Sequence, residues 1–417
     1  MNTSSPNTVA LPTPGVATPE PAGGVAFGKP NTKNARSRVE KMLGQIAAAH
    51  KAASYKKAKH LSIMYLRSFD ARYVAVLEAY KALKQRHRPA WKSLPAIARG
   101  LDAWKGTQEL VILRLKEKDK SPGVYRDIKE FGIQNRALQY LVLPLLKVQA
   151  NLHPNQYGMI GTHAAVKRVA ELMTQGYVWA METDLKDCYP SFDGEKIQGI
   201  LPLPKKVTQH IMCCAPLNLS LGNDGIFGPA DDDVDDEDVF PELFADARQG
   251  IPQGSAASPF AIEMLLSSVF DQLPACGEAV GYADNTLAMG KSESDAVSMN
   301  KALWSALEAN PAGHLRPKQT GVFSPGQPID FLGHRLTLQG NKVRIEPTPE
   351  NLAKYRVAVE RGLRRIVHGA SSTARARRAR ELRRDIRSWC AAFKLWDEAG
   401  ARKAKDFGRI SKTINSH

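Results

Sequence analysis

The sequence predicts an α+β fold with a helical region at each end, and three observations lead to this class. Between about residues 118 and 345, short runs rich in β-branched and aromatic residues alternate with helical patterns. Upstream, from Ala35 to about Lys84, apolar residues recur at helical spacing. The last 70 residues, roughly, are also of helical character. Such an arrangement is typical of a mixed core with helical lobes attached to it.

The composition is that of a globular protein with a polyanionic partner. The 417 residues are 43% hydrophobic and carry a formal net charge of +16, which favours nucleic acid as the partner. The longest apolar run, "ALQYLVLPLL", is too short to span a membrane and contains Pro144. No apolar signal segment begins the chain, so a cytoplasmic location is expected. The five cysteines include no CxxC pair, which argues against a zinc knuckle or a disulfide framework.

The N-terminal third is expected to contain a disordered segment and a basic helical extension. Residues 1–34 carry six prolines among small polar residues, and we expect them to be disordered. The helical extension covers residues 35–117 and should begin with two or three helices, separated near Ala53 and Ser68. Residues 85–120 are expected to be mainly helical.

The first half of the core is expected to alternate between strands and helices. It begins with the strand "VYRDIKEFGI" and the helix "NRALQYLVLPLLKVQANL". A second helix ends at Gly176, and the strand "YVWAMETDL" follows it. Ser191 is the expected cap of the next helix, and Asp193 would meet the favourable dipole at its start. Asp187 is expected to be structural.

The second half of the core contains a long apolar helix and a hairpin. The helix follows the turn "IPQGSAASP", and the hairpin is "GYADNTLAMG". A helix from about Ser292 to Glu308 follows, and then short strands at "QTGVFS" and "IDFLGHRLTL".

Charge is concentrated in two segments of the chain. The acidic block "ADDDVDDEDVFPE" holds eight carboxylates and has little helical or strand period, so a solvated loop is expected. Between Arg356 and Arg387 there are 11 arginines in predicted helices. They form either a solvated helix face or a surface for phosphate oxygens, which the planar guanidinium binds with two parallel hydrogen bonds.

Asp184, at the end of a predicted strand, and Asp284, at the tip of the hairpin, are the candidate catalytic carboxylates. Taken singly, each is an ordinary turn or cap residue. As a pair on neighbouring strands they fit two-metal phosphoryl transfer, in which carboxylates hold two divalent ions about 3.5–4 Å apart. The two side chains are therefore expected to converge.

Five segments of the sequence resemble, in order, the palm motifs of reverse transcriptases. They are "METDLKDCYPSFD", "GIPQGSAASPFAIEMLL", "GYADNTLAMG", "HLRPKQTGVF" and "FLGHRL". The segment from residue 124 to 146 resembles the finger region, and residues 54–80 resemble the N-terminal helices of group II intron-type enzymes. The resemblance covers roughly residues 38–390. It implies a right-hand polymerase fold with fingers at 118–180, a palm at 181–345 with an acidic insertion at about 215–248, and a helical thumb at 346–417.

The resemblance implies a role for each residue nearest to the chemistry. Asp184, Asp284 and the main-chain carbonyl of Leu185 would hold two Mg²⁺ ions. Tyr189 matches the steric gate, an aromatic ring that excludes a ribose 2′-hydroxyl; an ordinary buried aromatic residue is the alternative. Lys318 matches a lysine proposed to protonate the pyrophosphate as a general acid.

The resemblance also implies nucleotide-binding and nucleic-acid-binding positions. Arg126 matches a finger arginine that lies on the triphosphate. Gln253 and Gly254 match the turn against the incoming nucleotide, where a small residue lets the backbone approach the substrate. The nucleic-acid-binding residues are those of the turn that resembles the primer grip and the thumb arginines: Phe331, Leu332, Gly333, Arg364, Arg365, Arg377, Arg378 and Arg384.

The hairpin departs from the family at one position, because Asn285 follows Asp284 where the family usually has a second aspartate. Three interpretations are open. The enzyme is active with the two bridging aspartates and favours Mn²⁺ over Mg²⁺, since its site carries less charge. Alternatively, activity is lost and an RNA-binding protein remains, or the asparagine was introduced to trap a complex. The first interpretation is preferred because the other motif residues are intact.

The leading functional prediction is a bacterial RNA-directed DNA polymerase whose partners are an RNA template, a DNA product or primer, and dNTPs. The motif "PQGSAASP" differs from the "PQGxPTSP" frequent in retrons, which favours the defence-associated, abortive-infection type. A dedicated structured non-coding RNA and a role in anti-phage defence are implied. The alternatives are a maturase-like RNA-binding protein and a template-independent nucleotidyl transferase of the same fold. The template, the priming mode and the oligomeric state are not predicted.

Overall fold

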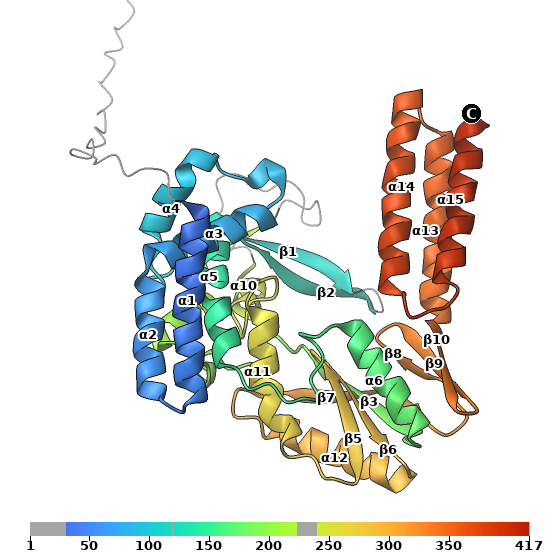
Figure 1. Cartoon of the computed structure of the whole chain (residues 1–417), viewed down its shortest axis with the longest axis horizontal. Helices are drawn as coiled ribbons and strands as arrows, with labels where there is room; N and C mark the ends of the chain where they lie inside the picture. The colour runs from blue at the N-terminus through green and yellow to red at the C-terminus, as the bar shows by residue number, and fades with distance from the viewer. Residues whose placement is uncertain (1–30, 119–120, 223–239, 417) are drawn as a thin grey trace, which may run out of the picture.

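The computed structural model describes residues 31–118, 121–222 and 240–416. In this part of the chain, helices surround three small β-sheets, and the α+β class predicted from the sequence is confirmed. Figure 1 shows N-terminal helices on one side, a central sheet below, and three C-terminal helices standing on the other side. The hairpin β1–β2 lies between the two helical regions.

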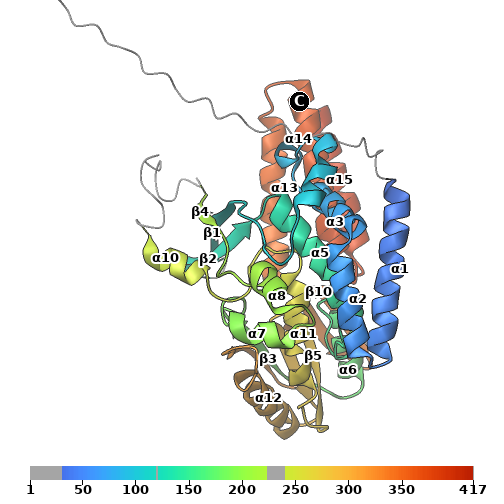
Figure 2. The ribbon, with the colours of Figure 1, turned by 90° about the vertical axis from the view of Figure 1, so that its left-hand side faces the viewer.

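The N-terminal part is a layer of helices that packs on the core helix α5. Its α-helices are α1 (Thr32–Lys51), α2 (Tyr55–Arg67), α3 (Phe69–Ala82) and α4 (Leu94–Gly100), with 3-10 turns at Gln85–His87 and Trp91–Ser93. The predicted breaks near Ala53 and Ser68 are confirmed. Figure 2 shows α1 at the outer edge of the molecule, beside α2 and α3.

The start of α1 corrects the extent of the segment predicted to be disordered. The side chain of Asn31 accepts hydrogen bonds from the backbone N–H groups of Lys33 and Asn34, so the helix begins at Thr32. Residues 32–34 are therefore helical, and residues 1–30 lie outside the described part of the chain.

The second correction concerns residues 85–120, which are not mainly helical. Two short turns and α4 are followed by strand β1 (Val111–Lys118), which pairs antiparallel with β2 (Ser121–Glu130) and parallel with β4 (Leu219–Leu221). The helical prediction for this strand was wrong because its hydrogen-bond partners come from segments outside its own window, one of them about a hundred residues away. Tertiary pairing of this kind overrides local propensity.

The central sheet has the strand order β5-β6-β3-β7 and is antiparallel throughout. Its strands are β3 (Trp179–Lys186), β5 (Gly277–Tyr282), β6 (Asn285–Gly290) and β7 (Arg316–Phe323). The other helices of the core are α5 (Ile133–Gln149), α6 (Thr162–Thr174), α7 (Gly194–Ile200), α8 (Lys205–Met212), α10 (Pro241–Ala247), α11 (Ser258–Phe270) and α12 (Glu293–Glu308). Helix α12 packs along the sheet, as Figure 1 shows. Its predicted start is confirmed, since Ser292 and Asp295 form a reciprocal capping box.

The helix predicted to begin at Ser191 begins later. Asp193 is its N-cap and accepts hydrogen bonds from the N–H groups of Glu195 and Lys196, so α7 starts at Gly194. The hydroxyl of Ser191 instead donates to the carbonyl of Asp187 at 2.8 Å. Asp193 is confirmed at the helix start, and the prediction for Ser191 was wrong because its hydroxyl already has a partner in the preceding turn.

The region expected to be an acidic loop has regular structure at both of its flanks. Strand β4 lies on its N-terminal side and helix α10 on its C-terminal side. Phe244 and Ala247 of α10 are 1% exposed and pack against the sheet that contains β1. The block of carboxylates itself, up to residue 239, lies outside the described residues.

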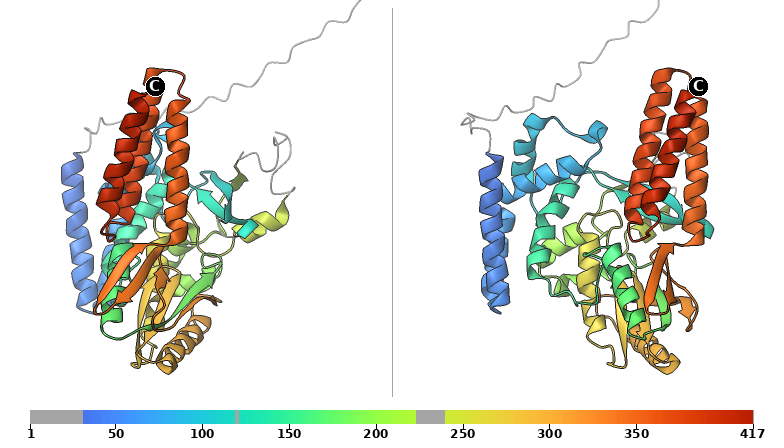
Figure 3. Two further views of the ribbon diagram at one scale, coloured as in Figure 1. Left: turned by 90° about the vertical axis from the view of Figure 1, so that its right-hand side faces the viewer. Right: turned by 45° about the vertical axis from the view of Figure 1, so that its right-hand side comes forward.

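The C-terminal part is a helical bundle joined to the core by a small sheet of order β10-β9-β8. Its elements are β8 (Ile329–Phe331), β9 (His334–Gln339), β10 (Lys342–Pro347), α13 (Pro349–Val367), α14 (Ser372–Ala392) and α15 (Ala399–Asn415). The predicted helical character is confirmed, and strand β10 was not predicted. Figure 3 shows the three helices side by side above this sheet.

Candidate active site

Asp184 lies in the middle of the central sheet, between two polar partners. In the antiparallel register it is directly opposite Asn285 of β6 and Lys318 of β7. Directly opposed residues project from the same face of a sheet, so these three side chains share one face. Next to Asp184, Thr183 projects to the other face, where its hydroxyl donates to Asn300 of α12 at 2.9 Å. The Asp184 face is therefore the one that α12 does not cover.

The hairpin tip brings Asp284 to the end of β3. The backbone N–H of Leu185 donates to the carbonyl of Asp284 at 3.1 Å. The N–H and C=O groups of a strand residue point towards the same neighbour, so the carbonyl of Leu185 also faces the hairpin. Ala283, at the tip, has a φ of 53°, a left-handed conformation that a non-glycine residue adopts only at a cost. Asp184, Leu185 and Asp284 thus come together from two adjacent strands.

The carboxylate of Asp284 is half-buried and held in place by its neighbours. Burial raises its pKa, while its own backbone N–H, the amide of Asn285 and the charge of Arg126 oppose that rise. The amide nitrogen of Asn285 donates to Asp284 Oδ1 at 3.1 Å. In this structure Asn285 is therefore a hydrogen-bond donor to the carboxylate of Asp284.

The buried thiol of Cys188 is influenced by the charges of both Asp184 and Asp284. Burial raises its pKa, and the charges of Asp284, Asp184 and Glu263 raise it further. The thiol therefore lies within electrostatic reach of Asp184, Asp284 and Glu263.

The donor set at this point fits a hard divalent cation. In the described part of the chain, no group of three or more His, Cys, Asp or Glu side chains is arranged to hold a metal. What converges here is two carboxylates and main-chain carbonyl oxygen, an all-oxygen set without sulfur or imidazole. Mg²⁺ and Mn²⁺ prefer such ligands, and Mg²⁺ in particular needs few protein groups because it shares substrate phosphates.

Tyr189 lies in the turn that follows β3. Burial raises its pKa to about 12, and the charges of Cys188 and Asp284 contribute. Its carbonyl accepts a hydrogen bond from the N–H of Ile251 at 3.0 Å, which ties this turn to the segment before α11. The ring is partly buried against the main core, so the core packing offered as its alternative role accounts for part of its surface.

The Gln253–Gly254 turn packs against strand β2. The carbonyl of Gln253 accepts from the N–H of Lys129 at 2.9 Å. Gly254 has a φ of 106°, and a Cβ atom there would lie 2.4 Å from the carbonyl oxygen of Lys129. Glycine is thus required at this turn by the close approach of strand β2, a reason the sequence alone did not supply.

Arg126 and Lys318 approach the carboxylates from different sides. Arg126 is exposed on β2, and its positive charge opposes the rise in the pKa of Asp284. Lys318 is exposed on β7, opposite Asp184. Asp187, which has a φ of 50°, pairs with Arg316 at 3.3 Å, in keeping with a structural role.

Glu263 is a site residue that the sequence reasoning missed. It is 1% exposed on α11, and its Oε1 accepts from the N–H of Ala283, next to Asp284, at 3.0 Å. Its Oε2 accepts from the amide of Gln156 at 2.9 Å. A Cβ atom at Gly158 would lie 1.7 Å from Oε1, so only glycine leaves room for the carboxylate. A buried Glu in an apolar helix, followed by the tip of a hairpin, was the available signal.

The loop of Gln156 completes this clamp on the hairpin. The N–H of Tyr157 donates to the carbonyl of Gly281 at 2.7 Å, and the N–H of Gly281 donates to the carbonyl of Asn155 at 2.8 Å. The strand that carries Asp284 is therefore held by main-chain hydrogen bonds as well as by Glu263.

In the turn that resembles the primer grip, Phe331 is buried, whereas Leu332 and Gly333 are partly buried. Phe331 is 1% exposed and lies in the core, so its ring faces away from any nucleic acid. Leu332 and Gly333 have φ values of 48° and 78°, and the carbonyl of Gly333 accepts from the N–H of Thr348 and the amide of Asn351, both at 3.0 Å. This turn thus fixes the start of α13 to the central part of the protein.

The five arginines predicted to bind nucleic acid lie on α13 and α14, and they differ in their surroundings. Arg364 and Arg365 are exposed on α13, opposite its buried face. Arg378 donates to the carbonyl of Arg365 at 2.5 Å and so joins α14 to α13. Arg377 is 3.9 Å from Glu381, and Arg384 is 3.4 Å from Asp385.

Comparisons with known proteins add little to this geometry. No protein-family model matches the chain, and no curated protein matches its sequence. No helix in the described residues has the length and apolar character needed to cross a bilayer.

Two similar solved structures are telomerases. One is apo telomerase from Candida tropicalis truncated from its C-terminal domain, with 13% identity, a TM-score of 0.34, and coverage of 58% of this chain and 56% of that one. The other is telomerase from Candida albicans in complex with a TWJ fragment of telomeric RNA, with 11% identity, a TM-score of 0.31, and coverage of 75% and 59%. The chain thus spans less than two thirds of either. Both TM-scores lie below 0.5, so these two likenesses carry no information about the function of this chain.

Proposed function

We propose that this protein is an RNA-directed DNA polymerase that adds dNTPs to a primer by two-metal phosphoryl transfer. The observation that carries the proposal is the register of β3, in which Asp184 lies opposite Asn285 and Lys318 while Leu185 bonds to Asp284. Two carboxylates and a carbonyl from adjacent strands form the rigid anionic site that this chemistry needs.

Each neighbouring residue has a physical task in the proposed reaction. Asp184, Asp284 and the carbonyl of Leu185 would hold Mg²⁺ or Mn²⁺. The ions would activate the primer hydroxyl and neutralise the leaving pyrophosphate. Arg126 would bind the triphosphate, and Lys318 would donate a proton to the pyrophosphate. The ring of Tyr189 would exclude the 2′-hydroxyl of a ribonucleotide.

Asn285 supports an active site with two carboxylates rather than three. Its amide donates to Asp284, which favours the ionised form of that aspartate and fixes its orientation. The missing negative charge should weaken Mg²⁺ binding more than Mn²⁺ binding, since Mn²⁺ tolerates a less charged ligand shell. We therefore propose that Mn²⁺ supports the reaction at lower concentration than Mg²⁺.

A second candidate function is RNA binding without polymerisation. The absence of a second aspartate at position 285 favours it, because the site then carries one negative charge fewer for binding metal ions. Exposed arginines such as Arg364 and Arg365 would grip RNA in either case. The motif resemblance further leads us to propose a bacterial enzyme that copies a dedicated structured non-coding RNA in anti-phage defence. A template-independent nucleotidyl transferase is a third candidate, and it differs in needing no template strand.

The test is nucleotide incorporation by the full chain, with each dNTP or each NTP, with Mg²⁺ or Mn²⁺, on a primed RNA and on the primer alone. We expect template-dependent dNTP incorporation. Asp184→Ala should lower it by about a thousandfold or more, because it removes several kcal/mol of transition-state stabilisation. Its affinity for RNA should hardly change.

The matched control is Asp187→Asn, a change just after the end of β3 at a carboxylate that pairs with Arg316. It should retain most of the activity. Absence of incorporation with both metals would support the RNA-binding function instead, and extension of the primer without template would support the transferase. If the wild type uses NTPs and dNTPs equally well, the proposal that Tyr189 excludes ribonucleotides is wrong.

A further inference from the structure

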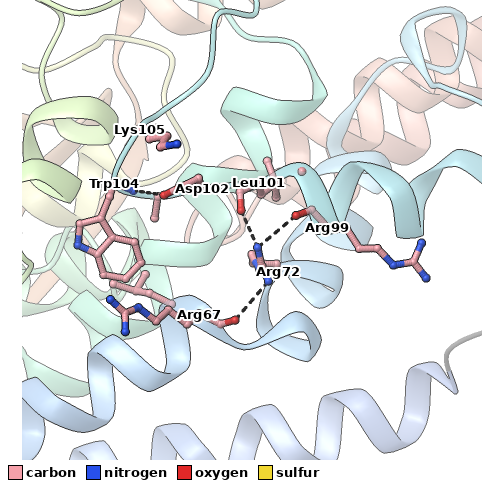
Figure 4. Close-up of a pocket in the computed structure, with 10 residues that line it drawn as sticks. Arg67, Arg72, Arg99, Leu101, Asp102, Trp104 and Lys105 are labelled. Carbon is pink, nitrogen blue, oxygen red and sulfur yellow. Dashed lines mark hydrogen bonds between the residues drawn. The ribbon is translucent and has the colours of Figure 1, made fainter. Parts of the chain in front are cut away.

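A cavity of about 520 Å³ lies in the N-terminal helical layer, outside the residues of the candidate active site. It is formed by the end of α2, the start of α3 and the segment that follows α4. Its lining residues are Leu66, Arg67, Arg72, Arg99, Gly100, Leu101, Asp102, Ala103, Trp104 and Lys105. Figure 4 shows them, with Arg72 in the middle and Trp104 to one side. The volume is within the range of small-ligand sites.

The charge of the cavity is strongly positive. Four of the lining residues are cationic, and Asp102 is the single acidic one. The carboxylate of Asp102 is turned to the backbone, since its Oδ1 accepts from the N–H of Trp104 at 2.8 Å. It therefore caps a local turn and offsets the cationic side chains only in part.

Arg72 carries a charge that no carboxylate of the described residues pairs with. One of its terminal nitrogens donates to the carbonyls of Leu101 and Arg99, at 2.7 and 3.3 Å. The other donates to the carbonyl of Arg67 at 3.3 Å. Its Nε is buried without a hydrogen-bond partner. A partly buried cation held only by neutral dipoles is stabilised by an anion placed next to it.

Arg67 and Trp104 form the side of the cavity that can recognise a ligand. The guanidinium of Arg67 lies over the indole ring at 5.3 Å from its centroid. Stacking occupies the flat face of the guanidinium and leaves its edge N–H groups directed outward, in the fork that fits two phosphate oxygens. Lys105, which is exposed, also lines the cavity and adds a further cation to it.

We propose that this cavity binds a nucleoside phosphate, with the phosphate between Arg67, Arg72 and Lys105 and the base against Trp104, and that its source is single-stranded RNA. A basic cavity with an aromatic wall is the pattern by which proteins hold unpaired nucleotides. The net charge of +16 favours a polyanion over a free nucleotide. The proposal rests on the RNA partner of the proposed function and requires no polymerisation.

The test measures binding of a fluorescent single-stranded RNA to the full chain at several salt concentrations, without dNTPs. The cavity variant is Arg67→Gln/Lys105→Gln. The control is Lys56→Gln/Lys59→Gln, which removes the same charge from exposed positions of α2. We expect the cavity variant to bind about tenfold more weakly than the control and to show a shallower salt slope by about one unit. Thermal unfolding checks that both variants fold.

Competition identifies the source of the phosphate. Inorganic phosphate, a nucleoside monophosphate and unlabelled RNA are added in turn to the wild type. Displacement by the monophosphate at concentrations where inorganic phosphate has no effect supports a nucleotide site that also accepts a free nucleotide. Displacement by RNA alone supports the RNA chain. Trp104→Leu should remove the advantage of the nucleotide over phosphate.

Equal RNA affinity and equal salt slopes for the cavity variant and the control would overturn the proposal. This result is distinguishable from failure of the proposed function, because Asp184→Ala should bind RNA as the wild type does. If the wild type incorporates dNTPs but the two double variants bind RNA equally, the proposed polymerase function is supported and the proposed nucleotide site in the cavity is contradicted.

Discussion

Charge has different roles in the hairpin of Asp284 and in the C-terminal helices α13–α15, which are called the thumb here after the sequence prediction. At the hairpin, Asp284 is half-buried, its carboxylate accepts from Asn285, and its backbone is held through Leu185 and Ala283. On α13, Arg364 and Arg365 are exposed and lie where the helical period puts them. The role proposed for the hairpin therefore depends on the precise position of one carboxylate, whereas RNA binding by the thumb depends on the summed charge of several arginines. Substitutions should have large effects in the first region and small, nearly additive effects in the second.

The thumb has one exception, at the buried carboxylate of Asp406. This residue is 0% exposed, and its Oδ2 accepts from the hydroxyl of Tyr355 at 2.6 Å and from Arg402 at 3.0 Å. Arg409 lies 3.5 Å from the other oxygen. Burial and this hydrogen bond raise the pKa of Tyr355. The network ties α15 to α13 from within.

The largest effect on activity among the following variants is expected for Glu263→Ala, which tests positioning at the hairpin. It removes the acceptor of the Ala283 N–H, so Asp284 shifts, and incorporation should fall about a hundredfold. Glu263→Gln keeps an acceptor oxygen and should recover part of the activity. Primer-extension rates with the wild type and Gln272→Ala, a change just beyond the end of α11, provide the reference. A Glu263→Ala enzyme with wild-type rate would show that the clamp does not position the site.

Asp406→Ala should be the most damaging change in the thumb. It leaves Arg402 and the hydroxyl of Tyr355 without this acceptor, while Arg409 keeps its ion pair with Glu360, so the bundle should lose about 3 kcal/mol of stability. Urea unfolding or limited proteolysis of α13–α15 measures this loss. The control is Asp385→Ala, an exposed aspartate of α14, which should change stability by less than about 0.5 kcal/mol. Similar stabilities for the two variants would remove the distinction between buried and exposed charge within the thumb.

Asn285→Asp sharpens the account of the hairpin. A second hairpin carboxylate should increase affinity for Mg²⁺, so the concentration needed for half-maximal incorporation should fall about threefold to tenfold. The preference for Mn²⁺ should fall with it. Asn285→Ala, which removes the amide donor without adding charge, separates charge from orientation. If Asn285→Asp requires more Mg²⁺ than the wild type, the amide matters chiefly because it donates to Asp284.

The smallest effects are expected for Arg364→Gln and Arg365→Gln, which test the summed charge of the thumb. Each should reduce the salt slope of RNA binding by about 0.7–0.9 for each lost phosphate contact, and the two should add. RNA-binding isotherms between low and physiological salt measure these slopes. Arg378→Gln is the contrast, because Arg378 donates to the carbonyl of Arg365 and should act on stability first. If either variant loses nucleotide incorporation without a change in the salt slope of RNA binding, these arginines act in the reaction and not in RNA binding.

Much of the fold could be predicted because its signals are local. The breaks near Ala53 and Ser68 and the start of a helix near Ser292 were all predicted from neighbouring residues. The helix expected to start at Ser191 failed because its hydroxyl bonds Asp187, while Asp193 supplies the cap. Two side chains of similar capping strength cannot be ranked from sequence when a turn consumes one of them.

The candidate site shows the same division. The sequence by itself determined which residues are available for chemistry, namely the pair Asp184 and Asp284 and the amide that follows. Residue type and turn position are properties of short segments, and they can be read without a fold. Only the tertiary structure decided that Glu263 clamps the hairpin and that a basic cavity forms beside Trp104. Glu263 and its partner Gln156 are 107 residues apart, and such contacts form only when the whole core packs.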